Sequence, residues 1–382
     1  MRKLAITAAA TLLATAALAQ NTMNTSLTLP TSGNNQRASV TQYIGPVKVT
    51  IDYSSPDVHA PNGEDRRGKI YGTDVVHWGW KNLGFGTCTA CPWRAGSNEN
   101  TVFTTSHDIQ IEGQKLPAGT YGLFMVADPA NWTVIFSKNS TSWGSYFYKP
   151  EEDALRVNVK PAGSEYNEWL TYEFIDRQPS SAVVAMKWED VQVPVKITVP
   201  DIVDAYLTEI RKELRSSPGF RWQNWNNAAQ YALQNKRFDD ALEFAQVAAK
   251  ANSFGSDENF QTLSTLAEAQ EAKGMTAEAR VTRNKALNHP TASVRQLHQY
   301  ARTELGKGNK SEAIRIWQLN AKRYPNQWPV NVGLMRAASA AGKYRDALRY
   351  AKRALAQAPD DLQKESIEAS IKKLEAGQDA NS

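Results

Sequence analysis

Lys236-Arg237-Phe238-Asp239-Asp240-Ala241-Leu242 is the first of four related stretches in the second half of the chain. The others begin at Gly274, Gly308 and Gly342, so the last three follow one another at intervals of 34 residues. A small residue recurs in all four, and a proline closes three of the units; these residues are Ala241, Ala279, Ala313 and Ala347, and Pro290, Pro325 and Pro359. A fixed period of this length predicts stacked helical hairpins, in which the small residue lets two helices approach closely.

This pattern resembles the tetratricopeptide repeat, with glycine at the inner turn and proline at the end. The first unit departs from it, because it is four residues longer and lacks the closing proline. The resemblance implies an α-helical solenoid of about four helix-turn-helix repeats over residues 220–376, including a polar capping helix over 362–376. It also implies a groove that binds a protein or peptide partner. A rigid spacer and a dimer surface are the alternatives.

Two short segments flank the predicted repeats. Ile202, Tyr206, Ile210 and Leu214 recur every four residues, which predicts a connecting helix over residues 201–217 that ends before Pro218. Residues 377–382 are predicted to be a disordered tail.

Residues 37–200 instead show the alternation of apolar and polar residues that is typical of short strands. Val47, Val49, Ile51 and Tyr53 alternate with polar residues, and residues 155–159, 170–174 and 193–199 repeat the pattern. Eight to ten strands without helical periods between them predict an antiparallel β-sandwich or barrel-like domain. The predicted fold class is therefore α+β multidomain, with a β-rich domain followed by a helical solenoid.

Several motifs occur in one order in the β-rich part. They are Ser55-Pro56, Arg67-Gly68-Lys69-Ile70-Tyr71-Gly72, Trp93-Arg94-Ala95-Gly96-Ser97-Asn98-Glu99, Leu116-Pro117-Ala118-Gly119-Thr120-Tyr121, Trp132-Thr133-Val134-Ile135-Phe136, Trp143-Gly144-Ser145-Tyr146 and Asp153-Ala154-Leu155-Arg156. This series resembles the bacterial family named domain of unknown function 2911, over residues 36–200. The resemblance implies an exported β-rich domain, often accompanied by helical repeats, and brings no assigned reaction. Ser97 replaces the alanine common in the family, and the stretch before Trp93 is longer here.

The N-terminus has the parts of a secretory signal peptide. Arg2 and Lys3 precede a short apolar run that ends at Ala17-Leu18-Ala19. We expect residues 1–19 to be removed, residues 20–36 to be a disordered lead-in, and the mature protein to be periplasmic or extracellular. No later segment of the sequence is apolar over the roughly 20 residues that span a bilayer, so we expect no membrane-spanning segment.

Charge is unevenly distributed along a chain of net charge +5. Residues 295–353 hold 13 basic and 3 acidic residues, which favours an acidic partner or an anionic surface. A solvated helical face is the alternative, because lysine and arginine are good helix formers. We expect no nucleic-acid partner and no cofactor.

The two cysteines, Cys88 and Cys91, are predicted to form a disulfide, since an exported protein with one such pair most often oxidises it. A redox-active pair is less favoured, because the surrounding glycines and Pro92 do not indicate a helix N-terminus. A zinc site in which the cysteines are joined by two of His59, His77 and His107 is the remaining alternative, with His77 and His107 as the leading pair.

Polar residues follow the cysteines closely. Arg94, Asn98 and Glu99 are candidate ligand-binding residues of one pocket. In it Arg94 would bind an anionic group, and Glu99 would act as base or acid. The alternative is an ion pair between Arg94 and Glu99 that fixes the loop. Arg67, His77 and Arg156 are further candidates that could join either arrangement. Tryptophans such as Trp78 and Trp80 could stack on sugar rings or belong to the core.

Three functions are compatible with these features. The first is an exported binding or scaffold protein, in which the β-rich domain binds a small or envelope-derived ligand and the repeats bind a protein or peptide. The second is an enzyme of unassigned reaction, for example hydrolysis, that uses Glu99 and Arg94. The third is a metal- or redox-dependent protein that uses Cys88 and Cys91. The common hydrolase motifs are absent from the sequence, so the sequence favours the first.

Overall fold

The computed structural model describes residues 35–251 and 253–382. It divides into two compact units between Pro200 and Asp201. The predicted signal peptide and nearly all of the predicted lead-in lie outside the described residues. No helix in the described part has both the length and the apolar character needed to cross a membrane.

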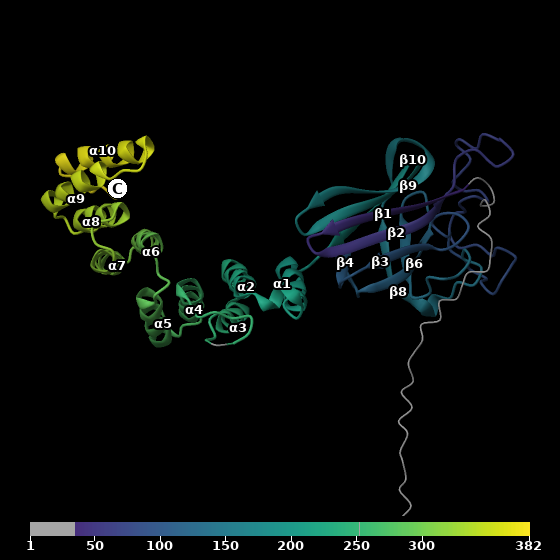
Figure 1. The fold of residues 1–382 in the computed structure, drawn as a ribbon. Helices are drawn as coiled ribbons and strands as arrows, with labels where there is room; N and C mark the ends of the chain where they lie inside the picture. Colours follow the sequence, from purple (N-terminus) through teal and green to yellow (C-terminus); the bar gives the residue numbers. More distant parts are fainter. Residues whose placement is uncertain (1–34, 252) are drawn as a thin grey trace, which may run out of the picture. The chain divides into compact units, whose positions relative to one another are not determined.

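Two antiparallel sheets build the first unit (Figure 1). One has six strands in the order β1-β2-β3-β6-β7-β8, and the other has four in the order β5-β4-β10-β9. The strands are β1 (Gln36–Ile44), β2 (Val47–Ser55), β3 (Thr101–Thr105), β4 (Ile109–Ile111), β5 (Gln114–Leu116), β6 (Gly119–Val126), β7 (Trp132–Ser137), β8 (Asp153–Val159), β9 (Ala162–Gln178) and β10 (Ser181–Thr198). Neither sheet closes on itself, so the β-rich unit is a sandwich and not a barrel.

Alternate side chains of both sheets form the core of this sandwich, as their period of two requires. Ile51 and Phe103 come from the six-stranded sheet, and Tyr172 and Val184 from the other. Together with their neighbours they surround a void of only about 10 Å³. The interior between the sheets is therefore almost completely filled.

One long connection, residues 56–100, joins β2 to β3 and is called here the site loop. It contains no strand, but single bridges attach it to the sheets, among them Asp57 to Trp169 and Trp93 to Met125. Trp93 also stacks on Trp188 of β10, with ring centroids 6.4 Å apart. These contacts hold a segment without regular structure in a defined position.

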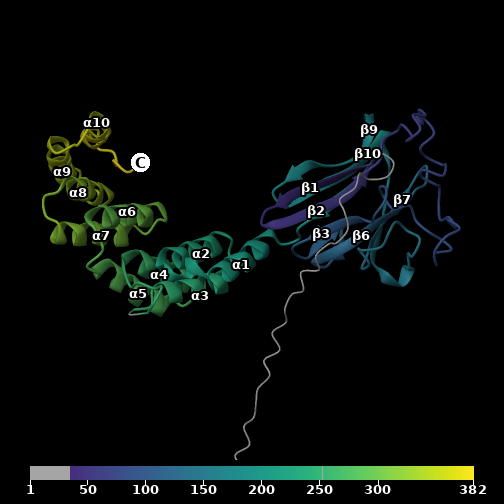
Figure 2. The same cartoon turned by 45° about the vertical axis from the view of Figure 1, so that its right-hand side comes forward.

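Helices build the second unit, together with a 3₁₀ turn at Ser217–Phe220. They are α1 (Ile202–Glu213), α2 (Trp222–Gln234), α3 (Phe238–Ala248), α4 (Phe260–Ala272), α5 (Thr276–Asn288), α6 (Val294–Gly306), α7 (Lys310–Arg323), α8 (Trp328–Ala340), α9 (Tyr344–Ala356) and α10 (Asp361–Glu375). From α2 to α9 they pack as four successive hairpins, which Figure 2 shows side by side. The predicted α+β fold class, with a sandwich and a helical repeat array, is confirmed.

The recurring alanines lie where the two helices of each hairpin meet, and all four are at most 1% exposed. The inner turns share a left-handed backbone: φ is 78° at Gly274, 87° at Gly308 and 74° at Gly342. Lys236 takes the corresponding place in the first hairpin with φ 60°. A left-handed conformation is costly for a residue with a Cβ, so glycine suits this turn and the first hairpin carries the less favourable residue.

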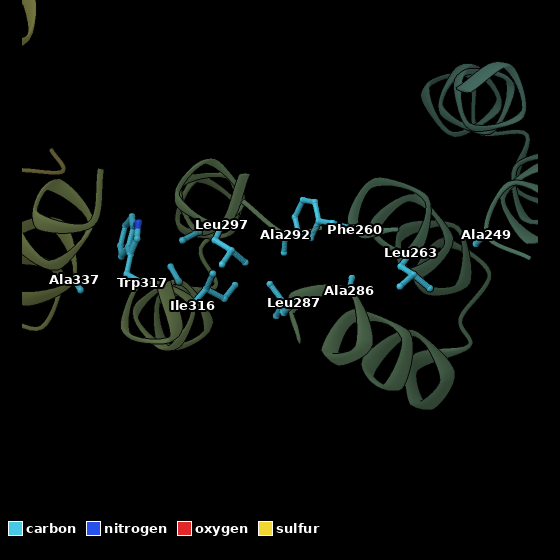
Figure 3. Close-up of a cluster of buried hydrophobic side chains, with 12 residues drawn as sticks. Ala249, Phe260, Leu263, Ala286, Leu287, Ala292, Leu297, Ile316, Trp317 and Ala337 are labelled. Carbon is cyan, nitrogen blue, oxygen red and sulfur yellow. The ribbon is translucent and has the colours of Figure 1, made fainter. Parts of the chain in front are cut away.

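Consecutive hairpins bury apolar side chains between them. Figure 3 shows one such cluster, in which Phe260, Leu287, Leu297 and Trp317 come from different helices. Each hairpin thus covers an apolar face of the next, and the buried residues of the helical unit gather in successive clusters along the array.

The chain turns back after α10 (Figure 2). Residues 377–382, which the sequence predicts to be a disordered tail, lie against α8, and Ala380 is buried. The hydroxyl of Ser339 on α8 donates to the carboxylate of Asp379 at 2.7 Å. Polar residues of the tail thus find partners on a helix, which their composition alone does not reveal.

Candidate functional site

A cavity of about 350 Å³ lies beside the site loop, and three predicted ligand-binding residues line it: Arg94, Asn98 and His77. The lining also includes Asp57, Arg66, Asp74, Trp93, Ser97, Ser145 and Trp188. This set combines two guanidinium groups, two carboxylates, an imidazole and two indole rings. We call it the Arg94 cavity.

Arg94 is held in place by the protein itself. Its guanidinium donates to the carbonyl of Asn98 at 3.1 Å and to the hydroxyl of Tyr146 at 3.3 Å. It also lies over the Tyr146 ring, 5.3 Å from the ring centroid, an arrangement favourable for a cation. Since the structure fixes the side chain while leaving it partly exposed, Arg94 is preorganised to receive an anionic group.

The backbone around Arg94 is unusual. Ala95 and Asn98 both have positive φ, at 54° and 57°, which is costly for residues other than glycine. The carbonyl of Ala95 accepts hydrogen bonds from the hydroxyls of Thr101 at 3.0 Å and Tyr172 at 2.8 Å. Burial raises the pKa of Tyr172 well above its usual value, so this hydroxyl stays a donor. Two buried donors therefore hold the strained segment.

His77 is a second chemically distinct group in the cavity. Its Nδ1 lies 3.0 Å from the carbonyl of Gly79, which can only accept, so Nδ1 carries the proton. Burial lowers the pKa of His77 below its usual value, outweighing the hydrogen bond to Gly79 that raises it. At neutral pH the imidazole is therefore uncharged, and its Nε2 lone pair can accept a hydrogen bond.

Glu99 does not join this cavity. It lines another of about 510 Å³, together with residues of β1 and β2 such as Arg37 and Asp52. The Ser54 hydroxyl donates to its carboxylate at 3.1 Å. Among the described residues Arg94 and Glu99 form no ion pair, so the interpretation of these two as a loop-fixing pair is wrong. The left-handed turn at Asn98 places them in different cavities.

The two remaining candidate arginines lie elsewhere. Arg67 is exposed and stacks on the Tyr166 ring at 4.3 Å. Arg156 pairs with Asp153 at 2.5 Å and donates to the Tyr148 hydroxyl at 3.0 Å. Neither lines the Arg94 cavity, so both occupy structural positions at other parts of the sandwich.

Cys88 and Cys91 form a disulfide, with Cα atoms 5.6 Å apart. Both are buried against Phe124 and Tyr148. The amide of Cys88 and its neighbour at Thr87 donate to the Tyr146 carbonyl, at 2.9 and 3.0 Å. The disulfide loop thus supports the residue that holds Arg94. Among the described residues no three histidines, cysteines or carboxylates come together as a metal site, so the zinc alternative is not assembled.

A third cavity, of about 440 Å³, has an aromatic wall formed by Tyr71, Trp78 and Trp132, with Asp128 and Asp190 beside it. Trp78 is 42% exposed and stacks on Tyr71 with centroids 6.2 Å apart. A Cβ on Gly72 would lie 2.2 Å from Trp78 Nε1, so the close approach of this ring requires glycine.

Sequence reasoning missed the cavity residues Asp57, Arg66 and Trp188. Trp188 lies on β10 beside a register shift between Lys187 and Glu189. Its sequence signal is the acidic pair Glu189-Asp190, which interrupts an apolar alternation. Asp57 follows the Ser55-Pro56 motif directly, and this proximity is the signal that marks it.

Comparison with known proteins finds a family that the β-rich unit matches. Residues 35–197 match the family described as Protein of unknown function (DUF2911). This match covers the site loop and both sheets except Thr198 at the end of β10, and it confirms the resemblance drawn from the motifs. The β-rich unit is called here the DUF2911 unit. No curated protein matches the chain.

Solved structures similar to the chain include two that are described as TPR proteins. A thermophilic TPR protein from Thermus thermophilus is 20% identical, with a TM-score of 0.30, and the match covers 44% of this chain and 90% of that one. YrrB, a TPR protein with an unusual peptide-binding site, is 13% identical over 44% of this chain and 84% of its own, with a TM-score of 0.29. MamA is 16% identical over 44% and 91%, with a TM-score of 0.29.

Proposed function

We propose that the protein is an exported binding or scaffold protein whose DUF2911 unit captures a small ligand carrying an anionic group. The observation that carries this proposal is the convergence of Arg94, Asn98 and His77 on one cavity. Arg94 would receive the anionic group by charge-assisted hydrogen bonds. The neutral His77 would accept a hydrogen bond from a hydroxyl of the same ligand, and Trp93 and Trp188 supply apolar surface.

The test is native mass spectrometry of the full chain purified gently from its exporting host, followed by calorimetric titration of the ligand so identified. Arg94→Ala should weaken binding at least 10-fold, because it removes the charged donor. Arg67→Ala is the matched control, since Arg67 is an arginine of the same unit outside the cavity. Equal binding by both variants would remove Arg94 from the site.

The geometry gives no support to the enzyme that uses Glu99 and Arg94 together, because the two side chains line different cavities. A binding role needs only the preorganised cation and the neutral acceptor. It predicts that the identified ligand is recovered chemically unchanged after prolonged incubation with the protein.

For the helical unit we propose that the repeats bind a protein or peptide partner. The stack of four hairpins and the basic stretch 295–353 support this. Cross-linking in intact cells, followed by mass spectrometry, should join lysines of residues 201–382 to a second protein. Cross-links confined to the chain itself would argue for a spacer.

Export itself is a proposal that rests on the signal-peptide pattern of residues 1–19 and on the disulfide. N-terminal sequencing of the protein from the periplasm or medium should begin at Gln20. Full-length protein retained in the cytoplasm would contradict it.

A further inference from the structure

Arg302 on α6 and Arg336 on α8 occupy the same position of consecutive repeats, 34 residues apart. Because the period preserves the side of the helix that a residue faces, and because α6 and α8 are in contact, the two arginines lie on one surface. Burial and then the charge of Arg302 lower the pKa of Arg336, and the carboxylate of Asp379 opposes this shift in part.

Neither arginine forms an ion pair within the described residues. Arg302 is exposed. Arg336 is largely covered, and its Nε is buried without a hydrogen-bond partner. Asp379 acts on Arg336 through its charge but forms no ion pair with it, and a guanidinium in a partly desolvated place is more favourable when a carboxylate reaches it directly. This surface, defined by Arg302, Arg336 and Ser339, is called here the α6–α8 cationic surface.

The chain's own segment Asp379–Ser382 lies on part of this surface. Asp379 accepts from Ser339, and the amide of Ala380 donates to the Ser339 hydroxyl at 2.8 Å. The side chain of Asn381 bridges Arg336 twice: its Oδ1 accepts from the guanidinium at 3.2 Å, and its Nδ2 donates to the backbone carbonyl at 3.0 Å.

The segment leaves Arg336 without a direct carboxylate contact, which indicates the kind of ligand that would bind more tightly. The carboxylate of Asp379 faces Ser339 and the amides of Asn381, not a guanidinium. Arg336 receives only the neutral amide oxygen of Asn381. A carboxylate at that place would form a charge-assisted and bidentate bond, which is roughly twice as strong as a neutral one.

We propose that the α6–α8 cationic surface binds an acidic peptide segment of a partner protein, and that residues 379–382 occupy it as an internal competitor. This rests on the proposed peptide binding by the repeats and specifies the chemistry of the partner. The tethered segment competes at a high effective concentration, so a partner must present a better acceptor to Arg302 and Arg336 in order to displace it.

A peptide added in trans tests the proposal. The probe is a fluorescently labelled peptide with the sequence of residues 375–382 carrying Asn381→Asp, which places a carboxylate at Arg336. The receptor is the full chain with Asp379→Ala and Asn381→Ala, in which the internal segment loses its contacts to α8. Fluorescence anisotropy should show at least about 10-fold tighter binding to this double variant than to the unmodified chain.

Arginine variants in the double-variant background locate the binding site. Arg302→Ala and Arg336→Ala should each weaken probe binding at least 10-fold, and Arg336→Lys should recover part of it, because lysine keeps the charge without the planar fork. Arg349→Ala on α9 is the matched control, since Arg349 is exposed and pairs with Asp346. Circular dichroism would verify that each variant is folded.

Two results would overturn the proposal. One is equal affinity of the probe for the double variant and the unmodified chain. The other is equal affinity of the Arg302 and Arg336 variants and the Arg349 control. In either case cross-links from the repeats to a partner in cells would still support the broader binding role, so the two failures are distinguishable.

Discussion

The guanidinium of Arg94 lies directly against Gly144. A Cβ on Gly144 would come within 2.9 Å of Arg94 Cζ, closer than real side chains approach one another. Gly144 belongs to the same segment as Tyr146, whose ring and hydroxyl contact Arg94 as well. The absence of a side chain at residue 144 therefore sets the position of the candidate ligand-binding cation.

Gly144→Ala should displace Arg94 and weaken ligand capture by the DUF2911 unit at least 10-fold. It should also lower stability by about 1–2 kcal/mol, because Gly144 has φ 57° and a left-handed conformation is costly for alanine. Gly113→Ala is the control, since Gly113 also has positive φ but nothing lies near its Cβ. Both variants should lose similar stability in urea denaturation, and only Gly144→Ala should lose the ligand.

The stability of the helical unit should fall in mild acid because of His298. Burial, and then the charges of Arg336 and Arg302, lower the pKa of His298 from 6.5 to about 4. Between these values the unfolded chain binds a proton that the folded chain does not, so unfolding becomes easier as the pH falls from 6.5 towards 4. The contribution is at most on the order of 3 kcal/mol.

Urea denaturation at pH 7, 5.5 and 4 measures this effect. His298→Gln should flatten the dependence in that window. An unchanged slope in the His298 variant would assign the acid sensitivity to other groups.

The disulfide should be present in the exported protein, with no free thiol before reduction and two after it. The double variant Cys88→Ala/Cys91→Ala should lose about 2 kcal/mol of unfolding free energy. This loss is small for a disulfide, because so short a loop restricts the unfolded chain only a little. Ligand affinity should fall several-fold as well, since the amides of Thr87 and Cys88 hold Tyr146. Two free thiols in the unreduced exported protein would contradict the pairing.

Substitution by alanine should have different effects on the free energy of unfolding at two glycines of the repeats. A Cβ on Gly333 of α8 would lie 2.6 Å from Cδ1 of the buried Trp317, whereas nothing lies near Gly306 at the end of α6. Gly333→Ala should cost about 1–3 kcal/mol through overpacking. Gly306→Ala should be neutral or stabilise by about 0.5–1 kcal/mol, by reducing the freedom of the unfolded chain. Urea denaturation of the two variants measures the difference.

The strands could be predicted because each buries one face. Val47, Val49 and Ile51 alternate with polar residues and lie in β2 with their side chains buried. The repeats could be predicted because Ala313 and Ala347 recur at one spacing and meet the facing helix of their hairpins. In both cases the interaction that decides the structure recurs at a short period, and so it is visible in the sequence.

The sequence predicted some residues of the candidate site but not which of them share a cavity. Arg94, Asn98 and Glu99 are near neighbours in sequence, but positive φ at Ala95 and Asn98 separates Glu99 from the cavity that the other two line. Non-glycine residues rarely adopt this conformation. Here it depends on buried hydroxyls of Thr101 and Tyr172, and Tyr172 comes from a strand far along the chain, 77 residues beyond Ala95.

The sequence alone determined that the chain consists of a strand-rich part and a helical repeat part. Buried residues recur at every second position in a strand, the buried alanine recurs once in each helical hairpin, and both recurrences can be seen in a short stretch of sequence. Only the tertiary structure decided which charged residues meet. It places His77 beside Arg94, removes Glu99 and Arg67 from them, and lays Asp379–Ser382 on α8. These relationships depend on contacts between distant segments and on single backbone angles, and neither produces a periodic pattern in the sequence.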